Sequence, residues 1–189
     1  MVSPAVIPNV LTVLRMLAVP PLVLLLLTGH YQLALVLVIA ASLTDALDGW
    51  LARRFGWQSR FGGFADPLAD KLLMVASYLT LTWLGYLPVW LLGLVLLRDL
   101  VIVAGGVVYH FVFEPVEAAP TLLSRINTVC QVVLVWYVMT HLAGVPLPIE
   151  PLYVLMGLVA LMTVITLVQY VWIWTFKAVA VSRARSPEP

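Results

Sequence analysis

Four aspartates stand close together in a chain that has few other charges. Asp45, Asp48, Asp66 and Asp70 lie within 26 positions and make up four of the nine acidic residues. A charged side chain inside a membrane helix costs roughly 2.5–3.5 kcal/mol on insertion scales, so such residues are candidates for a functional site. Carboxylates this close repel one another unless a cation lies between them, and oxygen ligands suit hard divalent ions. The sequence therefore predicts a site for one or two divalent metal ions.

The composition explains why these charges are unusual. Of the 189 residues, 63% are hydrophobic and 10% are charged, whereas a typical soluble domain has about 25% charged residues. This balance indicates an integral membrane protein. The net charge of +1 provides no polybasic surface for nucleic acid, and a single cysteine, Cys130, excludes an intrachain disulfide.

Apolar runs long enough to cross a bilayer, about 20 residues each, occur six times. They cover roughly residues 8–28, 32–54, 61–84, 88–110, 121–141 and 150–175, and segments containing Gly or Pro separate them. We therefore predict an all-α integral membrane protein with six transmembrane helices. Residues 1–182 are expected to form a single domain, and residues 183–189 a disordered tail.

The distribution of lysine and arginine predicts how these spans are oriented. Three arginines lie in the loop at 53–60, and one lysine and two arginines follow residue 176. The loops at the opposite ends of the spans contain neither residue type. Because cytoplasmic loops are enriched in basic residues, both termini and the aspartates near the 53–60 loop are predicted to face the cytoplasm.

On helices the aspartates form two pairs. Asp45 and Asp48 are three residues apart and Asp66 and Asp70 are four apart, so each pair shares a helix face. The short connection at 53–60 predicts antiparallel neighbouring helices whose carboxylate faces meet at one depth. Small residues that permit close approach of helices lie on the same segments: Gly49, Ala52, Gly62 and Gly63. Two facing carboxylate pairs can hold metal ions that contact both oxygens of a displacement at phosphorus, while one carboxylate takes a proton from the attacking hydroxyl.

The full spacing, DxxDGxxAR followed after eight residues by GxxxDxxxD, resembles the motif of the CDP-alcohol phosphatidyltransferase family at all eight positions. Members of that family are six-helix membrane enzymes, usually homodimers, that displace CMP from a CDP-linked donor with an alcohol. The resemblance implies two Mg²⁺ or Mn²⁺ ions, bound by Asp45, Asp48, Asp66 and Asp70, and it implies that Asp70 is also the general base. It further implies contacts to the cytidine diphosphate group from Gly49, Ala52, Arg53 and Gly62.

The segments around the motif indicate which members of the family this chain resembles most. PNVLTVLR at 8–15 and DPLADK at 66–71 look like segments of phosphatidylglycerophosphate synthases and cardiolipin synthases. PT at 120–121 and SRINTVCQ at 124–131 look more like the CDP-type cardiolipin synthases, with Arg125 where those usually have Lys, and a guanidinium is not equivalent to an ammonium. We therefore expect CDP-diacylglycerol as donor and phosphatidylglycerol as acceptor, with glycerol 3-phosphate as the alternative acceptor. Candidates for binding the acceptor phosphate are Arg15, Lys71 and Arg125.

Two other classes of protein stay open. Intramembrane carboxylates also occur in cation transporters, but that class predicts inverted repeats and charges near the bilayer midplane. This sequence shows no repeat, and its aspartates cluster toward one end of the spans. A scaffold protein with an inactive site is the other class, and the presence of all four aspartates argues against it. With no obvious transit peptide, the expected location is a bacterial inner membrane, with the site facing the cytoplasm.

Overall fold

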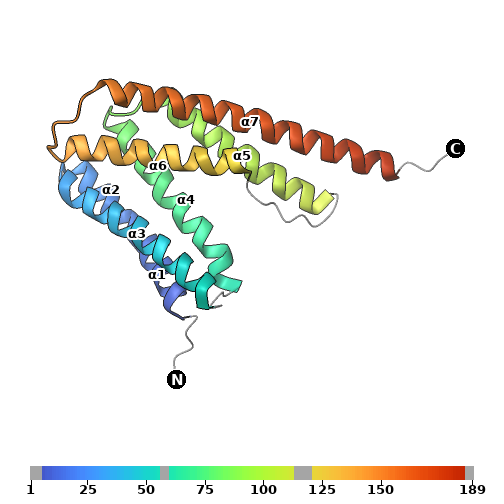
Figure 1. The fold of residues 1–189 in the computed structure, drawn as a ribbon, viewed down its shortest axis with the longest axis horizontal. Helices are drawn as coiled ribbons and strands as arrows, with labels where there is room; N and C mark the ends of the chain where they lie inside the picture. Colours follow the sequence, from blue (N-terminus) through green and yellow to red (C-terminus); the bar gives the residue numbers. More distant parts are fainter. Residues whose placement is uncertain (1–5, 56–59, 113–120, 186–189) are drawn as a thin grey trace. The chain divides into compact units, whose positions relative to one another are not determined.

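The computed structural model describes residues 6–55, 60–112 and 121–185, and within them the regular structure is entirely helical (Figure 1). The helices of these residues are, in order, α1 (Val6–Leu17), α2 (Val19–Leu27), α3 (Tyr31–Phe55), α4 (Arg60–Trp83), α5 (Val89–Val112), α6 (Leu122–Leu142) and α7 (Glu150–Arg185). The prediction of an all-α chain is thus confirmed for the part that the structure describes. Each predicted span corresponds to one helix, except the first, which is divided between α1 and α2.

The break between α1 and α2 lies at Ala18, just before Pro20 and Pro21. Proline has no backbone N–H, so these two residues cannot donate to the carbonyl oxygens one turn earlier. The break is local, because the Leu22 N–H donates to the Ala18 carbonyl at 3.0 Å. Residues 6–27 therefore form one interrupted helical segment rather than the continuous helix expected from the apolar pattern.

Four stretches of the described residues are long and apolar enough to cross a membrane: Val10–Leu27, Val89–Val108, Leu122–Leu142 and Glu150–Phe176. They support an integral membrane protein. In α3, the apolar stretch with described side chains is Tyr31–Thr44, and the side chains of residues 45–53 lie outside the description. The count of six spans and the orientation of the termini remain predictions.

The described helices form two compact units. The first contains α1, α2, α3, α4 and the C-terminal part of α6, and the second contains α5, the N-terminal part of α6 and α7. In the first unit, α1 and α2 each pack against both α3 and α4. This arrangement places α1 against both helices that carry the aspartates.

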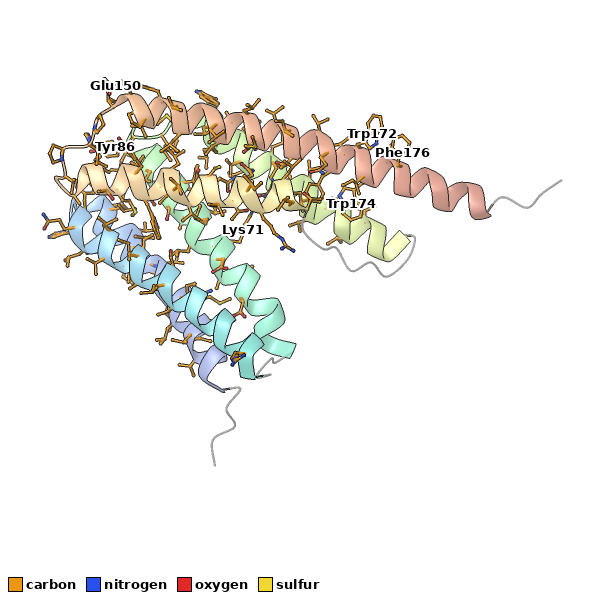
Figure 2. All side chains as sticks on the ribbon, in the orientation of Figure 1. Lys71, Tyr86, Glu150, Trp172, Trp174 and Phe176 are labelled. Carbon is orange, nitrogen blue, oxygen red and sulfur yellow. The ribbon has the colours of Figure 1, made fainter. Side chains whose placement is uncertain are left out.

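In the second unit, α5 packs along α7. The two helices lie close together at Gly105, where a Cβ atom would lie 2.5 Å from two atoms of the Trp174 ring. Figure 2 shows Trp174 on the side of α7 that faces α5, whereas Trp172 and Phe176 lie on the other side, where their rings stack with centroids 4.7 Å apart. The absence of a side chain at Gly105 therefore makes room for the indole ring.

Helix α7 continues to Arg185, three residues into the segment that the sequence assigns to a disordered tail. Alanine and arginine are among the strongest helix formers, and they occupy residues 183–185. These three residues therefore belong to α7, and the division into a domain at 1–182 and a tail remains a prediction. Residues 186–189 lie outside the described part of the chain.

Candidate functional site

All eight motif positions fall on two helices. Asp45 and Asp48 lie in the C-terminal half of α3, and Asp66 and Asp70 lie in the first half of α4. The one-turn spacing of each pair is therefore realised in the backbone. The side chains of six motif positions are outside the described residues, so the roles predicted for them, and the meeting of the two carboxylate faces, remain predictions: Asp45, Asp48, Gly49, Ala52, Arg53 and Gly62.

The two motif aspartates whose side chains are described, Asp66 and Asp70, are both held by α1. The Thr12 hydroxyl donates a hydrogen bond to Asp66 Oδ1, and Arg15 Nη1 forms an ion pair with Asp70 Oδ1 at 2.6 Å. Thr12 and Arg15 are three residues apart, and so share a face of α1, just as the two aspartates share a face of α4. Because both residue numbers rise together, α1 and α4 run in the same direction where these contacts join them.

The partners in these contacts differ in burial. Thr12 is fully buried, and the Arg15 side chain is 1% exposed, whereas the Asp70 side chain is 47% exposed. The arginine therefore lies behind the carboxylate, and Asp70 can be reached from outside the unit. Lys71, the next residue, is half-buried.

Of the two α1 residues in these contacts, the sequence predicts a site role for Arg15 but not for Thr12. Arg15 is a predicted ligand of the acceptor phosphate, and the structure gives its guanidinium a carboxylate partner on α4; the phosphate role itself remains a prediction. Thr12 is not among the predicted site residues. Its spacing of three from Arg15 was the available signal, since that spacing places both side chains on one helix face.

The chemistry of Asp66 and Asp70 fits a hard divalent cation, because Mg²⁺ and Mn²⁺ prefer oxygen ligands. The contacts to α1 engage Oδ1 of each carboxylate. Among the residues whose side chains are described, no group of three or more His, Cys, Asp or Glu residues could hold a metal ion. The predicted four-carboxylate set therefore depends on Asp45 and Asp48.

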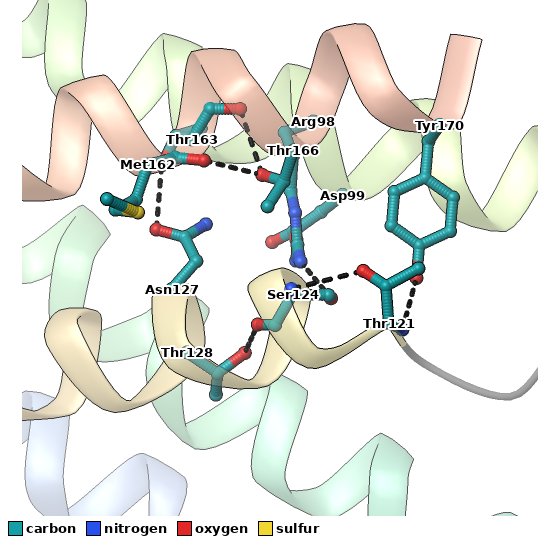
Figure 3. Close-up of polar contacts among 10 residues, drawn as sticks. All are labelled: Arg98, Asp99, Thr121, Ser124, Asn127, Thr128, Met162, Thr163, Thr166 and Tyr170. Carbon is teal, nitrogen blue, oxygen red and sulfur yellow. Dashed lines mark hydrogen bonds and ion pairs between the residues drawn. The ribbon is translucent and has the colours of Figure 1, made fainter. Parts of the chain in front are cut away.

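A second group of polar residues lies in the other unit, buried between α5 and α6 (Figure 3). Arg98 Nη1 forms an ion pair with Asp99 Oδ1 at 2.7 Å, and Arg98 Nη2 donates to the Ser124 hydroxyl. All three residues are at least nine-tenths buried. An arginine in apolar surroundings needs such partners, so Ser124 links α6 to the ion pair of α5.

Further contacts join α6 to α7, as Figure 3 also shows. The Thr163 hydroxyl donates to Asn127 Oδ1 at 3.2 Å, and the Thr121 hydroxyl donates to Gln169 Oε1 at 3.1 Å. With Ser124 and Asn127 turned inward, Arg125 is left exposed. The segment at 121–131 is thus anchored through its buried polar residues, while Arg125 stays exposed; its predicted role at the acceptor phosphate remains a prediction.

The fold and the site together define a helical membrane protein in which two motif aspartates of α4 are held by residues of α1. The model of the CDP-alcohol phosphatidyltransferase family matches residues 5–175, and this chain belongs to that family. The resemblance seen in the eight-position motif is thereby confirmed.

Relatives in the family carry two kinds of name. A protein of Mycobacterium tuberculosis strain H37Rv, named probable phosphatidylglycerophosphate synthase, is 36% identical over 170 residues, which cover 86% of this chain and 78% of the relative. A Drosophila melanogaster protein, named probable cardiolipin synthase (CMP-forming), is 38% identical over 141 residues, covering 66% of this chain and 44% of the relative. The human cardiolipin synthase (CMP-forming) is 34% identical over 149 residues, covering 70% of this chain and 50% of the relative. The chain thus spans half or less of the length of these two cardiolipin synthases.

Proposed function

We propose that this chain transfers a phosphatidyl group from CDP-diacylglycerol to an alcohol acceptor and releases CMP. The observation that carries the proposal is the pair Asp66 and Asp70, two motif carboxylates held at one face of α4 by buried residues of α1. In an apolar chain, carboxylates fixed in this way at a reachable surface are suited to binding a cation and a charged substrate. Membership of the CDP-alcohol phosphatidyltransferase family supports the same chemistry.

In the proposed reaction, the acceptor hydroxyl attacks the phosphorus that bears the diacylglycerol group. A phosphorus–oxygen bond forms to the acceptor, the bond to the CMP oxygen breaks, and the hydroxyl proton passes to Asp70. The partial exposure of Asp70 lets an acceptor approach it. Divalent ions, Mg²⁺ or Mn²⁺, held by Asp45, Asp48, Asp66 and Asp70 would neutralise charge on the diphosphate.

The donor and acceptor are proposed to lie against different residues. The cytidine diphosphate group is assigned to four motif positions near the ends of α3 and α4: Gly49, Ala52, Arg53 and Gly62. For the acceptor phosphate, the exposed guanidinium of Arg125 is a better candidate than Arg15, whose side chain is buried and paired. Lys71, next to Asp70, is the third candidate. The proposal includes a homodimer in a bacterial inner membrane, with this site facing the cytoplasm.

Phosphatidylglycerol is the proposed acceptor, which makes cardiolipin the product. The segment at 120–131 supports this choice through its likeness to CDP-type cardiolipin synthases, and the fly and human relatives described above carry that name. Glycerol 3-phosphate is the second candidate, because the mycobacterial relative named phosphatidylglycerophosphate synthase aligns with more of both chains.

The test is CMP release by purified protein given CDP-diacylglycerol and Mg²⁺, with phosphatidylglycerol and glycerol 3-phosphate in parallel reactions. Release with phosphatidylglycerol alone, together with a four-chain lipid product, is the expected result. Release with glycerol 3-phosphate alone would keep the chemistry and replace the acceptor. Cation flux into sealed vesicles without lipid turnover would instead favour the transporter class.

A further inference from the structure

The hydroxyl of Thr12 makes a contact that burial alone does not require. Thr80, a buried threonine of α4, donates its hydroxyl to the Ala76 carbonyl of its own helix at 2.8 Å. This pattern is a common way for a helix to satisfy a threonine in apolar surroundings. Thr12, which is fully buried, crosses to another helix and donates to Asp66 Oδ1. A hydroxyl bound to a carboxylate on a neighbouring helix constrains how that carboxylate is oriented.

Arg15 makes the equivalent contact one turn further along. Its side chain is 1% exposed, and its Nη1 lies 2.6 Å from Asp70 Oδ1. A guanidinium is planar and keeps its charge, so a buried arginine fixes both the position and the charge environment of its partner. Both carboxylates are thus held at Oδ1 by residues three positions apart on one face of α1.

We propose that Thr12 and Arg15 are positioning residues that orient Asp66 and Asp70 for the divalent ion and for the acceptor hydroxyl. This inference rests on the proposed function, in which the two aspartates bind metal and Asp70 accepts a proton. Groups that hydrogen-bond to metal-binding side chains fix their orientation, and losing such a group typically lowers metal affinity or activity about 10–100-fold. Helix α1 therefore contributes to the site by holding the carboxylates of α4.

The test for Thr12 measures Mn²⁺ binding by electron paramagnetic resonance on purified protein in lipid nanodiscs, without donor or acceptor. Thr12→Val keeps the side-chain shape but removes the donor, and we expect at least about ten-fold weaker Mn²⁺ binding. Thr12→Ser keeps a hydroxyl and should restore most of the affinity. Thr80→Val is the matched control, because it removes a buried hydroxyl that bonds only to its own helix among the described contacts, and it should bind Mn²⁺ like the parent.

The outcomes separate this inference from the proposed function. Mn²⁺ binding that is lost in Asp66→Asn but unchanged in Thr12→Val would overturn the positioning role while leaving the metal site intact. No Mn²⁺ binding by the parent protein would overturn both. An equal loss in Thr12→Val and Thr80→Val would show a general packing effect and would also overturn the positioning role.

The test for Arg15 compares kcat with the acceptor KM. Arg15→Gln removes the cation behind Asp70, and we expect kcat to fall about ten-fold or more while the acceptor KM stays within about two-fold. Arg15→Lys retains the charge and should recover part of kcat; it is also the variant to use if the Gln variant does not fold. An acceptor KM raised about ten-fold at unchanged kcat would overturn the inference and assign Arg15 to the acceptor phosphate.

Discussion

Replacing Gly105 by alanine directly tests how α5 and α7 pack. A Cβ atom at this position would lie 2.5 Å from Cδ1 and Nε1 of Trp174 and 3.1 Å from Cε2. Gly93, on the same helix, serves as the control, because a Cβ atom added there would meet nothing within 4 Å. Both positions have helical backbone, so the two substitutions differ mainly in what the new methyl group meets.

The expected size of the effect follows from these distances. Forcing a methyl group into a packed contact typically costs about 1–3 kcal/mol, while replacing glycine by alanine in a helix gains up to about 1 kcal/mol. Gly105→Ala should therefore be destabilised relative to Gly93→Ala by about 1–3 kcal/mol, since both share the propensity gain. For a chain of this size the difference corresponds to a Tm shift of roughly 2–12 °C.

The assay is thermal denaturation of the purified variants in one detergent, followed by size-exclusion chromatography with fluorescence detection. A double-mutant cycle with Trp174→Leu isolates the contact, because removing the indole ring should relieve the clash. Gly105→Ala should then cost little in the Trp174→Leu background. An equal loss of Tm in both backgrounds, or no difference between the two glycine variants, would refute the reasoning.

Three further predictions concern the proposed general base, the divalent ions and the hydrogen bond between Arg98 and Ser124. Asp70→Asn should lower CMP release by at least about 10²-fold, as expected for loss of a general base, while CDP-donor binding stays measurable; full activity would exclude that role. Chelation of divalent ions with EDTA should stop CMP release, and Mg²⁺ or Mn²⁺ should restore it; activity that persists in EDTA would contradict a metal-dependent reaction. Ser124→Ala removes the hydroxyl that accepts from Arg98 and should cost about 1.5–3 kcal/mol of stability, measured as a lower Tm. Thr128→Val, which removes a hydroxyl bonded to its own helix, is the control, and an equal shift in both would refute the role of Ser124.

The helices follow from local sequence, and so their positions could be predicted closely. Long apolar runs separated by glycine and proline turns leave an α-helix as the only way to satisfy the backbone within each run. The expected run at 121–141 became α6 (Leu122–Leu142), and the run at 88–110 became α5 (Val89–Val112). The break at Ala18 was harder to foresee, because two prolines within an apolar run can either begin a new helix or only interrupt the existing one.

The motif also follows from the sequence, because its spacing is a property of one helix at a time. Asp66 and Asp70 are one turn apart, and any α-helix places them on a common face. The family could be recognised from such spacings alone, before the match over residues 5–175. The choice of acceptor could not, since it depends on how residues of several helices surround a ligand.

Only the tertiary structure decided which side chains bind the carboxylates of Asp66 and Asp70. Thr12 and Asp66 are 54 residues apart, and Arg15 and Asp70 are 55 apart. No periodicity relates residues at such separations, because their contact depends on the packing of α1 against α4. The sequence by itself determined the carboxylates and the turns that pair them, while the packing of two parallel helices decided that a buried hydroxyl and a buried guanidinium hold them.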